Sequence, residues 1–139
     1  MVTCTRDDVH RVLETEAKKC DPARGSLVCL SLRLHVSGAQ GKDFKAQVER
    51  ETRTILTGNT RTSDSLLRLE GTPYYAVLLR EVDVGDAQRL CQRLAGLLEE
   101  VDLAGEITVK VDSHVSTLTP DQSPQTFARE AVAGLTARR

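Results

Sequence analysis

The chain of 139 residues is poor in aromatic side chains and has almost no excess charge of either sign. Aromatic residues make up 3% of the sequence, tryptophan is absent, and the formal net charge is −1. Proteins that bind single-stranded nucleic acids stack the bases on aromatic rings, and proteins that bind duplexes neutralise phosphates with a surplus of lysine and arginine. The composition therefore argues against a nucleic-acid partner.

The sequence also lacks a long apolar run and any Cys-x-x-Cys pair. No stretch of about 18 apolar residues is present, and residues 1–8 reach charged side chains without an apolar signal region. We therefore expect a cytoplasmic protein without a membrane span. The histidines are scattered and the cysteines are widely spaced, which predicts free thiols and no metal site. The cysteines are Cys4, Cys20, Cys29 and Cys91.

What remains is the profile of one globular domain, which we expect to span residues 1–139. The chain is 40% hydrophobic and 28% charged, which is enough apolar material for one core. Hydrophobic periodicity predicts an alternation of helices and strands, typical of an α/β (α+β) domain with one sheet covered by helices. The expected strands are Ser26–Val36, Ser65–Glu70, Tyr74–Arg80 and Glu106–Val115. The expected helices begin at Arg6, cover Asp43–Thr57 and Ala87–Val101, and end the chain with a helix lined by Phe127, Ala131 and Leu135.

One stretch in the middle of the chain combines two short motifs. Arg61-Thr62-Ser63-Asp64 is followed, after five residues, by Glu70-Gly71-Thr72-Pro73-Tyr74. This frame resembles the signature of GGDEF domains, a family that makes cyclic di-GMP from two GTP molecules. In that family an Arg-x-x-Asp stands five residues before Gly-Gly-[Asp/Glu]-Glu-Phe. An arginine also lies two residues before the first glycine, as Arg68 does here.

The resemblance extends over nearly the whole chain. Segments similar to the family's first strand, the helix after its hairpin, its last strand and its closing helix follow in the family's order; they are Leu27–Leu34, Asp86–Leu94, Ile107–Val111 and Ala128–Arg138. The resemblance implies a GGDEF, or nucleotide-cyclase palm-like, fold. Such a fold has a central, mostly antiparallel sheet of about five strands flanked by helices.

The same resemblance implies that the catalytic half of the signature is degenerate. In the family, one metal-binding Asp comes from the first strand, where this chain has Ser31 and Arg33 as candidates. The third and fourth signature positions are Thr72 and Pro73 in place of two acidic residues, and Glu70 replaces the first glycine. Only Gly71 and the aromatic Tyr74 are kept. Magnesium prefers carboxylate oxygens, so we expect no Mg²⁺, no other cofactor and no diguanylate cyclase activity.

The Arg-x-x-Asp half is intact, and in the family it binds cyclic di-GMP away from the catalytic turn. A guanidinium matches the O6 and N7 acceptors of guanine, and a carboxylate accepts hydrogen bonds from its N1–H and amino group. The resemblance therefore implies a ligand site at Arg61 and Asp64. The family's third contact, an arginine on the next helix, falls on Arg93. Arg89 lies one turn earlier and shares its face.

Several functions are compatible with these residues. The favoured hypothesis is a catalytically inactive cyclic di-GMP receptor that acts through a protein partner or a second copy of the domain, possible as a homodimer. One alternative is a nucleotide-independent dimerisation or scaffold domain that regulates a partner. The other is a GTP-binding regulatory domain that uses the cleft where the family has its active site. An enzyme with new chemistry is disfavoured because His35, His114 and Asp112 form no nucleophile–base motif in the sequence.

Overall fold

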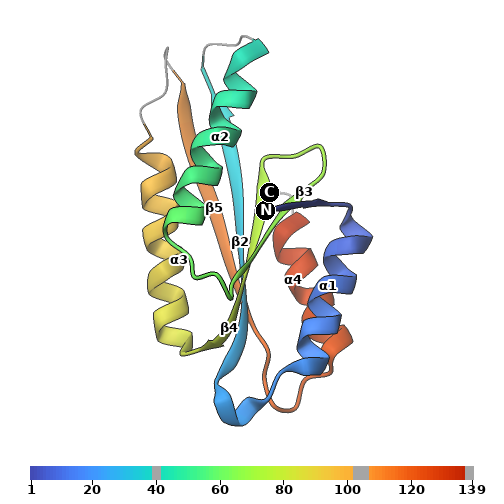
Figure 1. Cartoon of the computed structure of the whole chain (residues 1–139). Coiled ribbons are helices and arrows are strands. Elements are labelled where there is room, and N and C mark those ends of the chain that lie inside the picture. The colour runs from blue at the N-terminus through green and yellow to red at the C-terminus, as the bar shows by residue number, and fades with distance from the viewer. Residues whose placement is uncertain (39–41, 102–106, 137–139) are drawn as a thin grey trace.

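The computed structural model of the chain describes residues 1–38, 42–101 and 107–136 (Figure 1). Its described part contains one five-stranded sheet in the order β1-β3-β4-β2-β5, flanked by four α-helices. The strands are β1 (Val2–Cys4), β2 (Ser26–Ser37), β3 (Ser65–Leu69), β4 (Tyr74–Val82) and β5 (Thr108–Thr117). The helices are α1 (Arg6–Lys19), α2 (Lys42–Gly58), α3 (Val84–Glu99) and α4 (Pro124–Thr136), with a short 3₁₀ turn at Pro22–Arg24. The expected fold class is confirmed.

The sheet is antiparallel except at one edge. β3 and β4 form the expected hairpin, and β2 pairs antiparallel with both β4 and β5. β1 pairs parallel with β3, where Val2 lies opposite Leu67. The sequence analysis did not predict β1, because three residues are too short to show a period of two.

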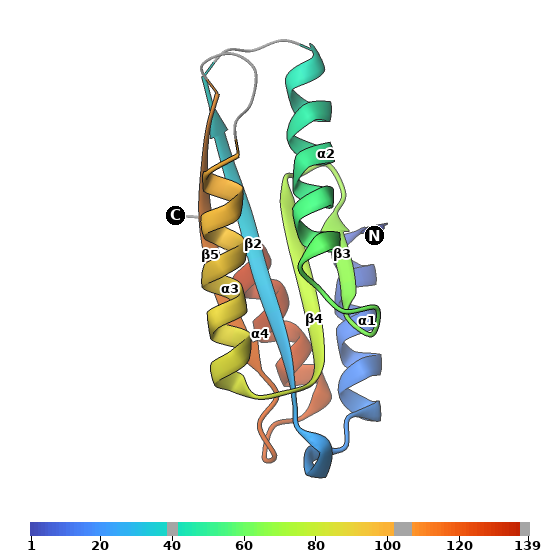
Figure 2. The same cartoon turned by 60° about the vertical axis from the view of Figure 1, so that its left-hand side comes forward.

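Two pairs of helices cover the two faces of the sheet (Figure 2). α2 and α3 pack on one face, where the buried residues include Leu30, Leu32 and Leu94. α1 and α4 pack on the other face, where Leu13, Cys29 and Phe127 are buried. Coverage on both sides explains why β2 reads as a continuous apolar run rather than an alternation.

The boundaries of the elements differ from the expected ones by a few residues. α1 begins where expected, because Thr5 and Asp8 form a capping box around its first turn. α3 begins at Val84 instead of Ala87, since the Asp83 carboxylate accepts a hydrogen bond from the Gly85 amide at 2.8 Å. The expected start of the last strand, Glu106, lies outside the described residues. In the part of the chain that is described, no helix is long and apolar enough to cross a bilayer.

Gly25 stands at a turn that only glycine fits. Its φ is 128°, and a β-carbon on it would lie 3.0 Å from the backbone of Glu81 in β4. We predict that Gly25→Ala lowers the free energy of unfolding by about 2–4 kcal/mol, from backbone strain and this close approach. Urea unfolding followed by circular dichroism measures the change. Gly58→Ala is the matched control, because a β-carbon there meets nothing within 4 Å; equal losses in both variants would contradict the prediction.

Candidate functional site

The Arg61–Asp64 segment forms a tight turn between α2 and β3. The Asp64 carboxylate accepts hydrogen bonds from the Arg61 amide at 2.8 Å and from the Arg61 guanidinium at 3.1 Å. The Asp64 amide donates to the Arg61 carbonyl at 3.0 Å, which closes the turn. As a result, the Asp64 side chain is only 2% exposed, whereas that of Arg61 is 54% exposed. Arg61 is therefore the member of the motif that faces solvent.

This turn forms one wall of a cavity of about 450 Å³ whose other wall is α3. The structure brings together the four side chains that the sequence proposed for the ligand site, namely Arg61, Asp64, Arg89 and Arg93. Leu79, Val82 and Leu90 supply an apolar floor, and Asn59 and Asp86 complete the lining. A concave site with an apolar floor and a few convergent polar groups is typical of small-molecule binding sites.

The charges in this cavity leave one arginine without a counter-ion. Arg89 is paired with Asp86 one turn earlier on α3, and Arg61 is paired with Asp64. Arg93 is exposed and has neither a hydrogen bond nor an ion pair with any residue that the structure describes. The cavity therefore presents one uncompensated cation, which favours an anionic ligand.

Arg80, near the end of β4, supports the turn from the opposite face of the sheet. Its guanidinium donates to the Ser63 carbonyl, to the Ser65 hydroxyl at 2.8 Å and to the Glu16 carboxylate of α1 at 2.9 Å. Its backbone carbonyl accepts a hydrogen bond from the Arg61 guanidinium at 2.9 Å. The sequence analysis missed Arg80 and Glu16. The only available signal was an arginine on an inward-facing strand position, which requires a buried acceptor.

The hydrogen bond from Arg80 lowers the pKa of the Glu16 carboxyl below its usual value of 4.5, against the opposing effect of burial. A lowered pKa in the folded state stabilises the fold above the unfolded-state pKa, and this stabilisation is lost as the pH falls through the folded-state pKa. We predict that Glu16→Gln is less stable than the wild type by about 1 kcal/mol at pH 7. The difference should begin to shrink as the pH falls below 4.5 and should vanish below the folded-state pKa, and urea unfolding at several pH values measures it. A difference that stays constant down to pH 3 would contradict the prediction.

The segment Glu70–Tyr74, which the sequence analysis compared with the family signature, forms the turn of the β3–β4 hairpin. Gly71 adopts a φ of 74°, and Glu70 is exposed. The Thr72 hydroxyl donates to the Leu69 carbonyl at 2.9 Å and accepts from the Tyr74 amide at 3.2 Å, so the turn itself satisfies it. The Pro73 carbonyl accepts a hydrogen bond from the Leu34 amide of β2 at 3.1 Å. These contacts fix the conformation of the hairpin turn.

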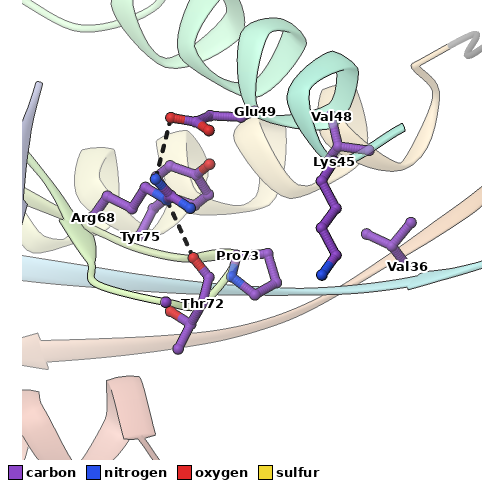
Figure 3. Close-up of a pocket in the computed structure, with 9 residues that line it drawn as sticks. Val36, Lys45, Val48, Glu49, Arg68, Thr72, Pro73 and Tyr75 are labelled. Carbon is purple, nitrogen blue, oxygen red and sulfur yellow. Dashed lines mark hydrogen bonds and ion pairs between the residues drawn. The ribbon is translucent and has the colours of Figure 1, made fainter. Parts of the chain in front are cut away.

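A second cavity, of about 260 Å³, lies between this hairpin turn and α2 (Figure 3). Arg68 spans it, donating to the Glu49 carboxylate and to the Thr72 carbonyl, each at 3.2 Å. Lys45 reaches from α2 toward Pro73 (Figure 3). Glu49 compensates Arg68, which leaves Lys45 as the remaining cation of this cavity's lining.

Ser31 and Arg33, the candidates for the family's metal-binding position, lie in β2 on the face of the sheet opposite this cavity. Ser31 is fully buried on the α4 side, where it pairs across the sheet with Ala76 and His114. Arg33 is 8% exposed and lies opposite Tyr74 in β4 and Asp112 in β5. The structure therefore brings Arg33 beside the hairpin turn but leaves Ser31 deeper in the core.

A histidine and a carboxylate meet close to Arg33. His35 Nε2 lies 2.8 Å from the Asp112 carboxylate, and the His35 ring packs edge-on against Tyr74. The sequence offered no reason to pair His35 with Asp112, since 77 residues separate them. Over the described residues, no cluster of three or more His, Cys, Asp or Glu side chains has the geometry to hold a metal ion.

The sheet order, the hairpin and the two helical layers give a palm-like α/β fold like that of GGDEF domains, and the comparisons with solved structures agree. The diguanylate cyclase SiaD of Pseudomonas aeruginosa, solved with its activator SiaC, superposes with a TM-score of 0.73 at 20% identity. That match covers 94% of this chain but only 53% of SiaD, so the chain spans about half of that protein.

Two further neighbours are isolated GGDEF domains. The domain of DgcB from Caulobacter crescentus, solved with cyclic di-GMP, gives a TM-score of 0.68 at 16% identity and covers 97% of this chain and 84% of that one. The domain of FimX from P. aeruginosa gives 0.66 at 14% identity, with 94% and 85% covered. No family model matches the sequence, and no curated protein matches it either. At these identities the neighbours establish the fold.

Proposed function

We propose that this chain is a catalytically inactive GGDEF-type domain that binds cyclic di-GMP in the cavity between the Arg61–Asp64 turn and α3. The observation that carries the proposal is the convergence of Arg61, Arg89 and Arg93, from two separate segments, on one cavity. The ligand has two guanines and two phosphates, and guanidinium groups recognise both. The domain of DgcB, which shares this fold, was solved with cyclic di-GMP.

The proposed site requires a rearrangement of Arg61. While its guanidinium covers Asp64, the carboxylate is 2% exposed and is out of reach of a ligand. When Arg61 turns toward a guanine edge, Asp64 becomes free to accept the guanine N1–H and amino group. Arg93 needs no such movement, because no described residue holds it. We infer that phosphate contacts at Arg93 form first and that Arg61 and Asp64 then read the base.

The proposed loss of catalysis rests on the chemistry of the side chains at the expected metal positions. Ser31, Arg33, Thr72 and Pro73 provide no anionic oxygen, and magnesium in such sites is held by carboxylates. The Thr72 hydroxyl is also committed to hydrogen bonds within its turn. Without carboxylates at these positions, no metal ion would be held there to activate a 3′-hydroxyl.

Such a receptor would act through another protein surface. Cyclic di-GMP has two guanine bases. A ligand held by one cavity through one guanine therefore leaves the second guanine for a partner protein or a second copy of this domain. We propose that the bound ligand bridges the domain to that partner, which makes the interaction dependent on the ligand.

Isothermal titration calorimetry with cyclic di-GMP and with GTP plus Mg²⁺ tests the proposal. We expect saturable binding of cyclic di-GMP and no saturable heat with GTP. Chromatography of a long incubation with GTP and Mg²⁺ should show no cyclic di-GMP. Formation of cyclic di-GMP would contradict the inactivity, and saturable GTP binding would favour the regulatory use of the hairpin cavity. No binding of either nucleotide would favour a scaffold domain.

A further inference from the structure

Arg80 contacts the Arg61–Asp64 turn, here called the ligand turn, at three points. It lies outside the cavity between this turn and α3, here called the arginine cavity. Its side chain donates to Ser63 and Ser65, which flank Asp64, and its carbonyl accepts from Arg61. A planar guanidinium presents several donors in a fixed geometry, so one side chain orients both ends of this short segment. Arg80 thereby fixes the backbone from which Arg61 and Asp64 project.

The position of Arg80 in β4 lets one strand serve both faces of the sheet. The pairing of β2 with β4 shifts register between Ser26 and Val28, and Glu81 has a φ of 53° at this irregularity. In a regular strand, Arg80 and Val82 would point to the same face. Here Arg80 reaches α1 on one face, whereas Val82 lines the arginine cavity on the other. Arg80 therefore faces α1 while its neighbours Leu79 and, after the β-bulge, Val82 line the cavity.

The partner of Arg80 on α1 is Glu16, at 2.9 Å. Both side chains are largely shielded from water, with exposed fractions of 30% for Arg80 and 22% for Glu16. A charge-assisted hydrogen bond in such surroundings is stronger than an exposed ion pair. A continuous chain of contacts therefore runs from the turn through Arg80 to α1.

Ligand binding must disturb one end of this chain. The same Arg61 nitrogen donates to the Asp64 carboxylate and to the Arg80 carbonyl. A ligand that recruits the Arg61 guanidinium competes for both hydrogen bonds, and the segment held by Arg80 must adjust to the change.

We propose that Arg80 is a positioning residue for the ligand turn and that the Arg80–Glu16 ion pair couples the turn to α1. The coupling to the ligand rests on the function proposed above, whereas the positioning role does not. Coupling between two sites is reciprocal, so a change at Glu16 alters ligand affinity and ligand binding alters the stability of α1. The domain would then report an occupied cavity through α1, on the opposite face of the sheet.

Hydrogen exchange of the ligand-free protein tests the positioning role. We expect Glu16→Gln to accelerate exchange of the amides at residues 61–65, far along the chain from the substitution. Glu14→Gln is the matched control, because Glu14 pairs only with His10 and Lys18 on its own helix among the described residues. Unchanged exchange at residues 61–65 in Glu16→Gln, or an equal acceleration in Glu14→Gln, would overturn the positioning role.

Calorimetry and exchange with cyclic di-GMP test the coupling. We expect Glu16→Gln to weaken binding about fivefold and Glu14→Gln to leave it unchanged. Arg80→Lys keeps the positive charge but loses the planar set of guanidinium donors, so it should weaken binding further. Saturating ligand should change hydrogen exchange in α1 of the wild type but not in α1 of Glu16→Gln.

If the wild type does not bind cyclic di-GMP, the proposed function fails, while hydrogen exchange of the ligand-free protein still decides the role of Arg80. If both glutamate variants bind equally tightly, the coupling fails and the function stands.

Discussion

Replacing Arg61 with alanine is expected to weaken cyclic di-GMP binding by about 2–3 kcal/mol, or roughly 30- to 150-fold. The guanidinium is the solvent-facing member of the turn and the group best suited to a guanine edge. Its removal also leaves the nearly buried Asp64 carboxylate without its ion-pair partner, so the turn loses order as well as a contact. Calorimetry at a temperature where the variant is fully folded measures the effect.

Two further variants separate recognition from folding. Arg93→Ala removes a side chain that has no partner among the described residues, so it should weaken binding without changing the unfolding free energy. Arg129→Ala removes an exposed arginine from α4, on the other face of the sheet, and should change neither quantity. Wild-type affinity in both Arg61→Ala and Arg93→Ala would refute the site.

Phe127→Ala is expected to cause the largest loss of stability, about 3–5 kcal/mol. Phe127 is fully buried between α4, α1 and the sheet, in the cluster that contains Leu13, Cys29 and Leu78. Among the described residues, Phe127 is the largest fully buried side chain of this cluster, so its truncation leaves a large cavity. Urea unfolding at pH 7 measures the loss, and Phe127→Leu, which conserves most of the volume, should cost less than half as much. A loss below 1 kcal/mol in Phe127→Ala would mean that α4 is not part of the cooperative core.

The convergence of Arg61, Asp64, Arg89 and Arg93 on one cavity could be anticipated from the sequence. The Arg-x-x-Asp keeps a fixed distance from the hairpin, and the helix after the hairpin returns across the same face of the sheet. The resemblance to a known frame therefore placed residues that lie far apart in the chain. The hairpin turn was predictable for a local reason, because Gly71 and Pro73 are strong turn formers.

Other features depended on three-dimensional contacts that leave no local pattern. The link between Glu16 and Arg80 joins residues 64 positions apart and requires α1 to pack against the end of β4. The near-complete burial of Asp64 follows from its hydrogen bonds within the turn, which a four-residue motif does not reveal. The His35–Asp112 pair required the register between β2 and β5. These contacts were absent from the sequence analysis because spacing along the chain does not encode them.

A titration of the ¹⁵N-labelled domain with cyclic di-GMP, followed by two-dimensional NMR, tests the central proposal most directly. The proposed site predicts that the largest shift changes fall on residues 61–64 and on the α3 turns that carry Arg89 and Arg93. The hairpin turn at residues 70–73 should change little, because it lies at the other cavity. A spectrum that does not change, or changes that centre on residues 70–73, would contradict the proposal that this domain binds cyclic di-GMP through its arginine cavity.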